Sequence, residues 1–154
     1  MLRNILSNLS AILYVQIWEY RIKVTDIKTL SVFDEKPLIE IKVLKNGKKE
    51  VVAFGNAANI KSLNPFSHPR GIISDFIGGE KLLEKIIHKV LSKGLFTPSP
   101  SIIMHVMEKN EGGLTVVEIR ALREMAAGAG ARSVVVYQGP ELNVSSINFD
   151  ELAK

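Results

Sequence analysis

The sequence predicts an α/β fold with a mixed sheet, antiparallel N-terminal strands and flanking helices. In the first third of the chain, apolar and polar residues alternate with a period of two, which is typical of half-exposed strands. Segments of helical periodicity then alternate with short apolar runs, which indicates helices packed on buried strands. With 154 residues and 46% apolar content, the chain fits one domain with a substantial core.

The first ten residues are predicted to form an amphipathic helix. Its apolar face would consist of Leu2, Ile5, Leu6 and Leu9, which are the candidates for membrane contact. The segment carries a single cation, so its binding would be marginal unless several copies acted together. An ordinary N-terminal turn docked on the domain explains the same pattern. Residues 11–154 are expected to form the single domain.

Residues 11–54 predict an antiparallel set of three or four strands. Residues 11–17 form an apolar run, and residues 18–24 alternate between apolar and polar side chains. Residues 38–44 alternate in the same way. Asn46-Gly47 is a strong hairpin signal, and it leads into the apolar residues 51–54.

The middle of the chain predicts two helices and a covered strand. Residues 55–63 are a short helix candidate, and residues 64–69 read as a loop. Residues 101–107 are almost continuously apolar, as expected for a strand covered on both faces. The clearest helix spans residues 79–92, with an apolar stripe formed by Leu82, Leu83, Ile86, Ile87, Val90 and Leu91.

A further helix is predicted to begin after Thr115. Glu118 lies three residues on, and the two side chains can form a capping box. Gly128 and Gly130 are expected to end this helix, because glycine adopts the left-handed C-cap conformation without steric cost. The three valines at 134–136 predict a buried strand, and the tail at 141–154 could dock one last helical turn.

The segment 115–132 reads Thr-x-Val-Glu-x-Arg-Ala-x-Arg-Glu-x-Ala-x-Gly-Ala-Gly-Ala-Arg. It closely resembles a helix of the MreB family, the actin-like rod-shape-determining proteins of bacteria. Residues 71–76, Gly-Ile-Ile-Ser-Asp-Phe, resemble that family's Gly-Val-Ile-Ala-Asp-Phe, and the prolines at 98, 100 and 140 fall where members have similar residues. The resemblance is strong from about Phe54 to Pro140. It implies a ribonuclease H-like subdomain of the actin fold, the one called IA.

The resemblance also bears on nucleotide binding. Actin-like ATPases hold nucleotide between two lobes, and the first hairpin of the first lobe carries an Asp-Leu-Gly-Thr phosphate loop. The matching residues 13–19 contain no Asp, Gly or Thr, although close backbone approach to phosphate favours glycine. The resemblance implies a second lobe as well, which we do not expect within these 154 residues. We therefore expect no bound nucleotide, no cofactor and no ATPase activity, because ligand sites normally enclose most of their ligand.

Glu118 is the one residual catalytic candidate, because the resemblance gives the Glu at this position a role in positioning the attacking water. The simpler interpretation is a capping-box partner, since a positioned water accelerates nothing without a phosphoryl group. His68, His88 and His105 fall in three different elements, and no metal-ligand spacing is present, so no metal site is expected. His105 lies in an apolar strand and is expected to be a core histidine with satisfied hydrogen bonds.

Composition narrows the range of partners. The net charge of +4 is modest and the basic residues are spread along the chain, so a nucleic-acid partner is not expected. The absence of cysteine excludes disulfides and thiolate chemistry. Together with the resemblance, it indicates a cytoplasmic protein, with peripheral contact at the inner membrane as an option.

The sequence therefore favours a non-catalytic MreB-like module for bacterial cell shape or the cytoskeleton. Its expected partners are MreB, another shape-complex protein or a second copy of itself. Two alternatives stay open. One is an actin-like ATPase that completes its site for ATP and Mg²⁺ by oligomerising, with Glu118 as a catalytic group. The other is a peripheral membrane module that binds through residues 1–10.

Overall fold

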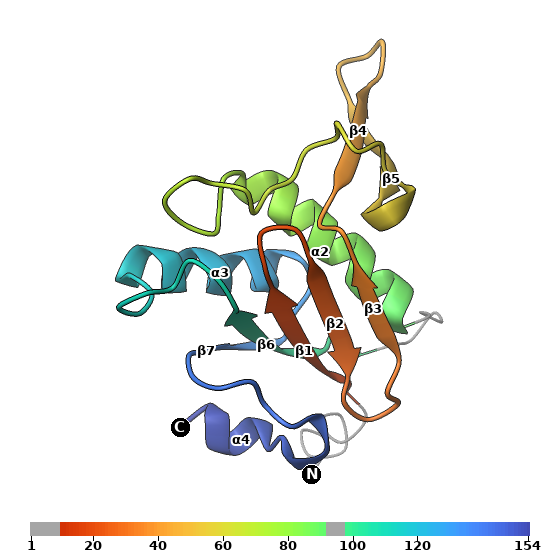
Figure 1. Cartoon of the computed structure of the whole chain (residues 1–154). Helices are drawn as coiled ribbons and strands as arrows, with labels where there is room; N and C mark the ends of the chain where they lie inside the picture. The colour runs from red at the N-terminus through yellow and green to blue at the C-terminus, as the bar shows by residue number, and fades with distance from the viewer. Residues whose placement is uncertain (1–9, 92–97) are drawn as a thin grey trace.

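The computed structural model describes residues 10–91 and 98–154 (Figure 1). The predicted N-terminal helix, with Leu2, Ile5, Leu6 and Leu9, lies outside these residues. In chain order the elements are β1 (Ile12–Ile17), β2 (Ile22–Asp26), β3 (Val32–Glu35), β4 (Ile39–Val43), β5 (Lys49–Phe54), the 3-10 turn η1 (Gly55–Ala57), α2 (Phe76–Leu91), β6 (Ser101–Val106), α3 (Val116–Gly128), β7 (Ser133–Tyr137), the 3-10 turn η2 (Val144–Ser146) and α4 (Phe149–Leu152).

The main sheet has five strands in the order β3-β2-β1-β6-β7. β1, β2 and β3 pair antiparallel, because short turns join them. β6 runs parallel to β1, and β7 runs parallel to β6, because helices carry the chain between these strands. This arrangement confirms the predicted mixed α/β sheet with an antiparallel N-terminal portion.

The predicted antiparallel set of residues 11–54 is divided between two sheets, which the sequence did not indicate. β4 and β5 form a separate hairpin that projects from the main sheet in Figure 1. Asn46-Gly47 makes its turn as predicted, with Gly47 at φ 81°. β3 was not predicted; it pairs with β2, and two of its four residues are exposed. The alternation at 18–24 predicts a strand that starts too early, because residues 18–21 form a turn and β2 begins at Ile22.

The core lies between the sheet and the helices α2 and α3. All of the predicted apolar stripe of α2 is buried except Leu91, which packs against the core. The two helices contact each other at Gly79, where an added Cβ would lie 2.7 Å from Met125 Cε. α2 begins at Phe76, three residues before the predicted start, and the Asp75 carboxylate accepts the Gly78 N–H at 2.6 Å.

Two local predictions need correction, and the predicted end of α3 is confirmed. Residues 55–63 hold only the short turn η1 and no α-helix. The valine run at 134–136 is half-buried, because β7 is the edge strand of the sheet. Gly128 is the last helical residue of α3, and Gly130, at φ 115°, takes the conformation that favours glycine. Across the described ranges, no helix has the length and apolar character needed to cross a membrane.

Candidate functional site

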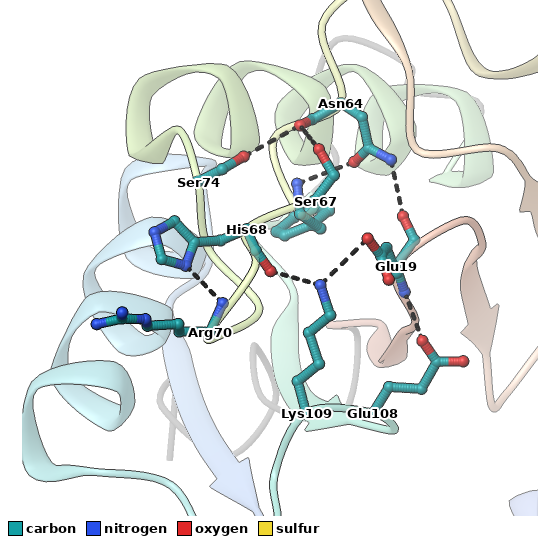
Figure 2. A network of polar contacts seen from close by, with 9 residues as sticks. Glu19, Asn64, Ser67, His68, Arg70, Ser74, Glu108 and Lys109 are labelled. Carbon is teal, nitrogen blue, oxygen red and sulfur yellow. Dashed lines mark hydrogen bonds and ion pairs between the residues drawn. The ribbon is translucent and has the colours of Figure 1, made fainter.

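Three loops meet at the carboxyl ends of the parallel strands, where α/β sheets usually bind ligands. Ile17 of β1 is opposite Val106 of β6, so the turn at 18–21 and the loop at 107–110 leave the same edge of the sheet. The segment 64–70 lies against both (Figure 2). This edge corresponds to the place where the MreB resemblance puts the first phosphate loop.

The turn at 18–21 is closed by its own side chains. The Trp18 N–H donates to the Arg21 carbonyl at 2.8 Å, and the Arg21 guanidinium lies 4.6 Å from the centroid of the Trp18 ring. Arg21 also donates two hydrogen bonds to the Asp34 carboxylate, at 2.7 and 2.6 Å. These bonds hold the pKa of Asp34 below its usual value. No residue of this turn has a positive φ, so it lacks the backbone geometry that a glycine would supply.

The central contact of the site joins the β1–β2 turn to the loop after β6. The Glu19 N–H donates to the Glu108 carboxylate at 3.1 Å. Lys109 lies between two loops, because its ammonium pairs with the Glu19 carboxylate at 3.2 Å and donates to the His68 carbonyl (Figure 2). Lys109 takes a left-handed backbone conformation, at φ 56°. The exposed backbone amide of the turn therefore already has an anionic partner from within the chain.

Asn64 connects the third loop to the same turn. Its side-chain amide donates to the Glu19 carbonyl at 2.7 Å, and its side-chain oxygen accepts the Phe66 N–H at 2.9 Å. Its backbone carbonyl accepts the hydroxyls of Ser67 and Ser74, each at 3.1 Å. Buried Phe66 fixes the loop to the core. The three loops thus form one hydrogen-bonded frame, referred to below as the three-loop network.

A groove of about 540 Å³ lies beside this network. Its walls include Tyr20 and Ile60, which are 71% and 75% exposed, together with buried Leu38. The charged side chains that line it are Glu19 and Lys36. A largely apolar groove with one carboxylate and one ammonium is a poor match for a polyphosphate, which needs several converging donors.

Glu118 occupies the capping box that the sequence predicts. Its N–H donates to the Thr115 hydroxyl oxygen at 3.1 Å, and its Oε2 accepts the Thr115 N–H at 2.7 Å. A Cβ built on Gly71 would lie 3.1 Å from Glu118 Oε1, which places this oxygen beside the 64–75 loop. The residual catalytic candidate therefore has one oxygen engaged in helix capping and the other near a loop backbone.

The histidines do not come together. His68 lies in the exposed loop, where its Nδ1 accepts the Arg70 N–H at 3.0 Å, and His88 is exposed on α2. His105 is buried with both ring nitrogens hydrogen-bonded, as predicted for a core histidine. In the part of the chain that the structure describes, no group of three or more His, Asp or Glu residues could hold a metal ion.

Sequence reasoning missed the residues that make the three-loop network. The predictions from the sequence assign no role to Glu108, Lys109 or Asn64. Glu108 and Lys109 could have been found as candidates, because polar residues that follow a buried strand of a parallel sheet often lie at its ligand-binding edge. The pairing of Glu108 with the Glu19 amide could not be predicted, since 89 residues separate them.

Comparison with known proteins places the chain in a family. The family model described as MreB/Mbl protein matches residues 31–145. The cell shape-determining protein MreB of Escherichia coli is 35% identical over 119 residues, which cover 71% of this chain and 33% of that protein. The MreB of Haemophilus influenzae is 34% identical over 119 residues, with 71% and 32% covered. The uncharacterized protein YjaA of Escherichia coli is 31% identical over 124 residues, with 77% and 76% covered.

Solved structures give the same result for the fold. MreB5 of Spiroplasma citri bound to ADP superposes with a TM-score of 0.61 at 17% identity, covering 84% of this chain and 38% of that one. Its complex with AMPPNP gives a TM-score of 0.59 at 19% identity, with 81% and 37% covered. The predicted actin-like, ribonuclease H-like α/β fold is thereby confirmed. The chain spans about a third of the length of the MreB relatives that it matches, and it belongs to the MreB/Mbl family.

Proposed function

We propose that this chain is a non-catalytic MreB-like domain that serves as a structural or interaction module in bacterial cell shape. The observation that carries the proposal is the hydrogen bond from the Glu19 N–H to the Glu108 carboxylate. In an actin-like ATPase, the first hairpin turn presents backbone N–H groups to phosphate. In this chain, the N–H of Glu19 in the matching turn already has an internal carboxylate as its acceptor.

Electrostatics support this reading. A phosphate group could bind the Glu19 N–H only by displacing the Glu108 carboxylate from it. The phosphate would then lie near two negative charges, those of the Glu19 and Glu108 side chains. Two like unit charges about 4 Å apart near a protein surface repel each other by roughly 4 kcal/mol. The nearby cation, Lys109, already contacts Glu19 and the His68 carbonyl. The local field therefore disfavours a polyphosphate.

The hydrogen bonds of the Glu118 side chain support the same proposal. Its Oε2 accepts two hydrogen bonds from Thr115, one from the backbone N–H and one from the hydroxyl at 3.1 Å. Such a capping box satisfies N–H groups of the first helical turn and requires no nucleotide. The capping box thus gives Glu118 a role that does not involve hydrolysis.

The partners in this proposal are proteins of the shape-determining apparatus. They comprise MreB itself, another shape-complex protein or a second copy of this chain, in the cytoplasm or at the inner surface of the membrane. Family membership motivates the choice. The groove beside the three-loop network, with exposed Tyr20 and Ile60, offers apolar surface of the kind that protein partners cover.

Co-sedimentation with purified MreB filaments tests the proposal. The wild-type chain should pellet with the filaments and stay in the supernatant without them. A variant with Tyr20→Ser and Ile60→Ser should lose the co-sedimentation, whereas Val116→Ser and Val117→Ser, which change equally exposed apolar residues on α3, should not. Failure to bind MreB or any shape-complex protein in a pull-down would count against the proposal.

A further inference from the structure

The second face of the main sheet is covered by the segment that follows β7. Figure 1 shows this segment, in blue, turning back beneath the sheet and ending in α4. Leu13, Val15 and Ile17 belong to the core, so the alternating residues Tyr14 and Gln16 point to the opposite face. Both are polar and fully buried, and so is His105 of β6, opposite Gln16.

Four hydrogen bonds connect β1, β6 and β7 to residues 139–142, and a fifth joins Tyr14 to His105 within the sheet. Gln16 Nε2 donates to the Glu141 carboxylate at 2.9 Å, and the Tyr137 hydroxyl donates to the Pro140 carbonyl at 2.9 Å. The Leu142 N–H donates to the Tyr14 hydroxyl oxygen at 3.1 Å. His105 lies at the centre, with Nδ1 at 2.7 Å from the Tyr14 hydroxyl and Nε2 at 2.9 Å from the Gly139 carbonyl oxygen.

The donor and acceptor inventory fixes the protonation state of His105. A carbonyl oxygen only accepts, so Nε2 must carry the proton that is donated to Gly139. Tyr14 accepts the Leu142 N–H and is free to donate its own hydroxyl proton to Nδ1. Every group in this chain of hydrogen bonds is satisfied when the ring is neutral. A proton on Nδ1 would reverse the bond to Tyr14 and leave the buried hydroxyl without an acceptor.

The surroundings oppose a charge on His105. Tyr14 of β1 stacks against the ring, and Tyr137 of β7 makes an edge contact at 4.8 Å between ring centroids. The facing charged group is Glu141, on the covering segment itself. Burial lowers the pKa of His105, and the Gly139 hydrogen bond and Glu141 only partly offset this effect.

Beyond residue 142 the covering segment makes little contact with the core. η2 and α4 contain no buried residue, and α4 is only four residues long. The core of the molecule lies on the other face of the sheet, among α2, α3 and the inward side chains. Separation of the segment would therefore leave that core intact.

We propose that residues 139–152 form a pH-sensitive latch, which neutral His105 holds closed over the second sheet face and which protonation of His105 releases. This device is independent of the proposed shape-related function. The latch is closed above the pKa of a free histidine, about 6.5. It weakens as the pH falls from there toward the lower pKa of the buried ring, by up to about tenfold per pH unit.

Hydrogen–deuterium exchange of the full chain at about pH 7.5 and about pH 5, corrected for intrinsic rates, tests this proposal. Peptides covering 139–152 should gain exchange at the lower pH, whereas peptides of α2 should not. Replacement of both His68→Gln and His88→Gln should leave this response unchanged. His105→Gln should abolish it, and Tyr14→Phe, which keeps the ring of His105, should open the segment at both pH values.

Three results would overturn the latch. These are equal protection of 139–152 at both pH values, an unchanged pH response in His105→Gln, or loss of protection in α2 together with the segment. If His105→Gln fails to fold, the double variant His68→Gln, His88→Gln decides by itself, because His105 is then the only histidine in the chain. Loss of the pH response of 139–152 in that variant would overturn the latch.

Discussion

Replacing Lys109 by methionine should loosen the three-loop network and lower the stability of the whole molecule. Methionine keeps the length and apolar stem of lysine but removes the ammonium group. The change deletes a charge-assisted hydrogen bond to the His68 carbonyl and the ion pair with Glu19. Backbone strain at φ 56° is the same for both residues, so it does not contribute to the difference.

The magnitude follows from these two contacts. A hydrogen bond from a charged donor contributes about 1.5–3 kcal/mol. The ion pair adds less than about 1 kcal/mol, because both side chains retain more than a fifth of their exposure. We expect a loss of about 2 kcal/mol in the free energy of unfolding, equivalent to about 4–8 °C in Tm for a chain of this size.

Urea denaturation followed by tryptophan fluorescence measures this loss. Trp18 is the single tryptophan and lies in the β1–β2 turn that Lys109 holds. The matched control is Arg120→Met, which removes an exposed cation from the Arg120–Glu124 pair and should cost less than about 0.5 kcal/mol. If Lys109→Met were no more destabilising than this control, the network would not contribute to stability as argued.

Three further predictions concern glycine, capping and ionisation. In denaturation experiments, Gly47→Ala should lower the free energy of unfolding by about 1 kcal/mol, because Gly47 has φ 81° but lies in open space. Gly55→Ala should cost clearly more, because φ is 67° and the new Cβ would also lie within 3 Å of Phe33. Thr115→Ala should cost about 1 kcal/mol through loss of the α3 cap, and no change in thermal unfolding would contradict that role. Burial raises the pKa of Tyr14, so above about pH 10 the unfolded chain loses the phenol proton before the folded chain does. The free energy of unfolding should therefore fall as the pH rises above about 10. Unfolding curves measured over a pH series should show that Tyr14→Phe removes this part of the alkaline loss.

The sequence predicted those parts of the fold that depend on residues close to each other in the chain. The stripe of α2 from Leu82 to Val90 follows the helical period, and the capping box of Thr115 involves residues three apart. The division of the strands in residues 11–54 between two sheets depends on tertiary packing, which the periodicity of the sequence does not report. β3 is a four-residue edge strand with mixed exposure, which gives a weak period-two signal.

The site was harder to predict than the fold. The bulky residues of the β1–β2 turn were visible in the sequence, and they suggested the loss of the phosphate loop. The partners of that turn were not visible, because Glu108 and Lys109 follow β6, which lies beside β1 in the sheet but is distant from it in the sequence. In the same way, the bond between Tyr14 and His105 joins residues 91 positions apart. Such pairings depend on the strand register, which the sequence does not fix.

Calorimetric titration of the full chain with Mg-ATP tests the central claim most directly. With the Glu19 amide already bound to Glu108 and Glu118 engaged in its helix cap, we predict no saturable heat at millimolar nucleotide, for the wild type and for Glu118→Ala alike. Micromolar binding by the wild type that weakens in Glu118→Ala would contradict the claim, and it would favour an ATPase that completes its site by oligomerising.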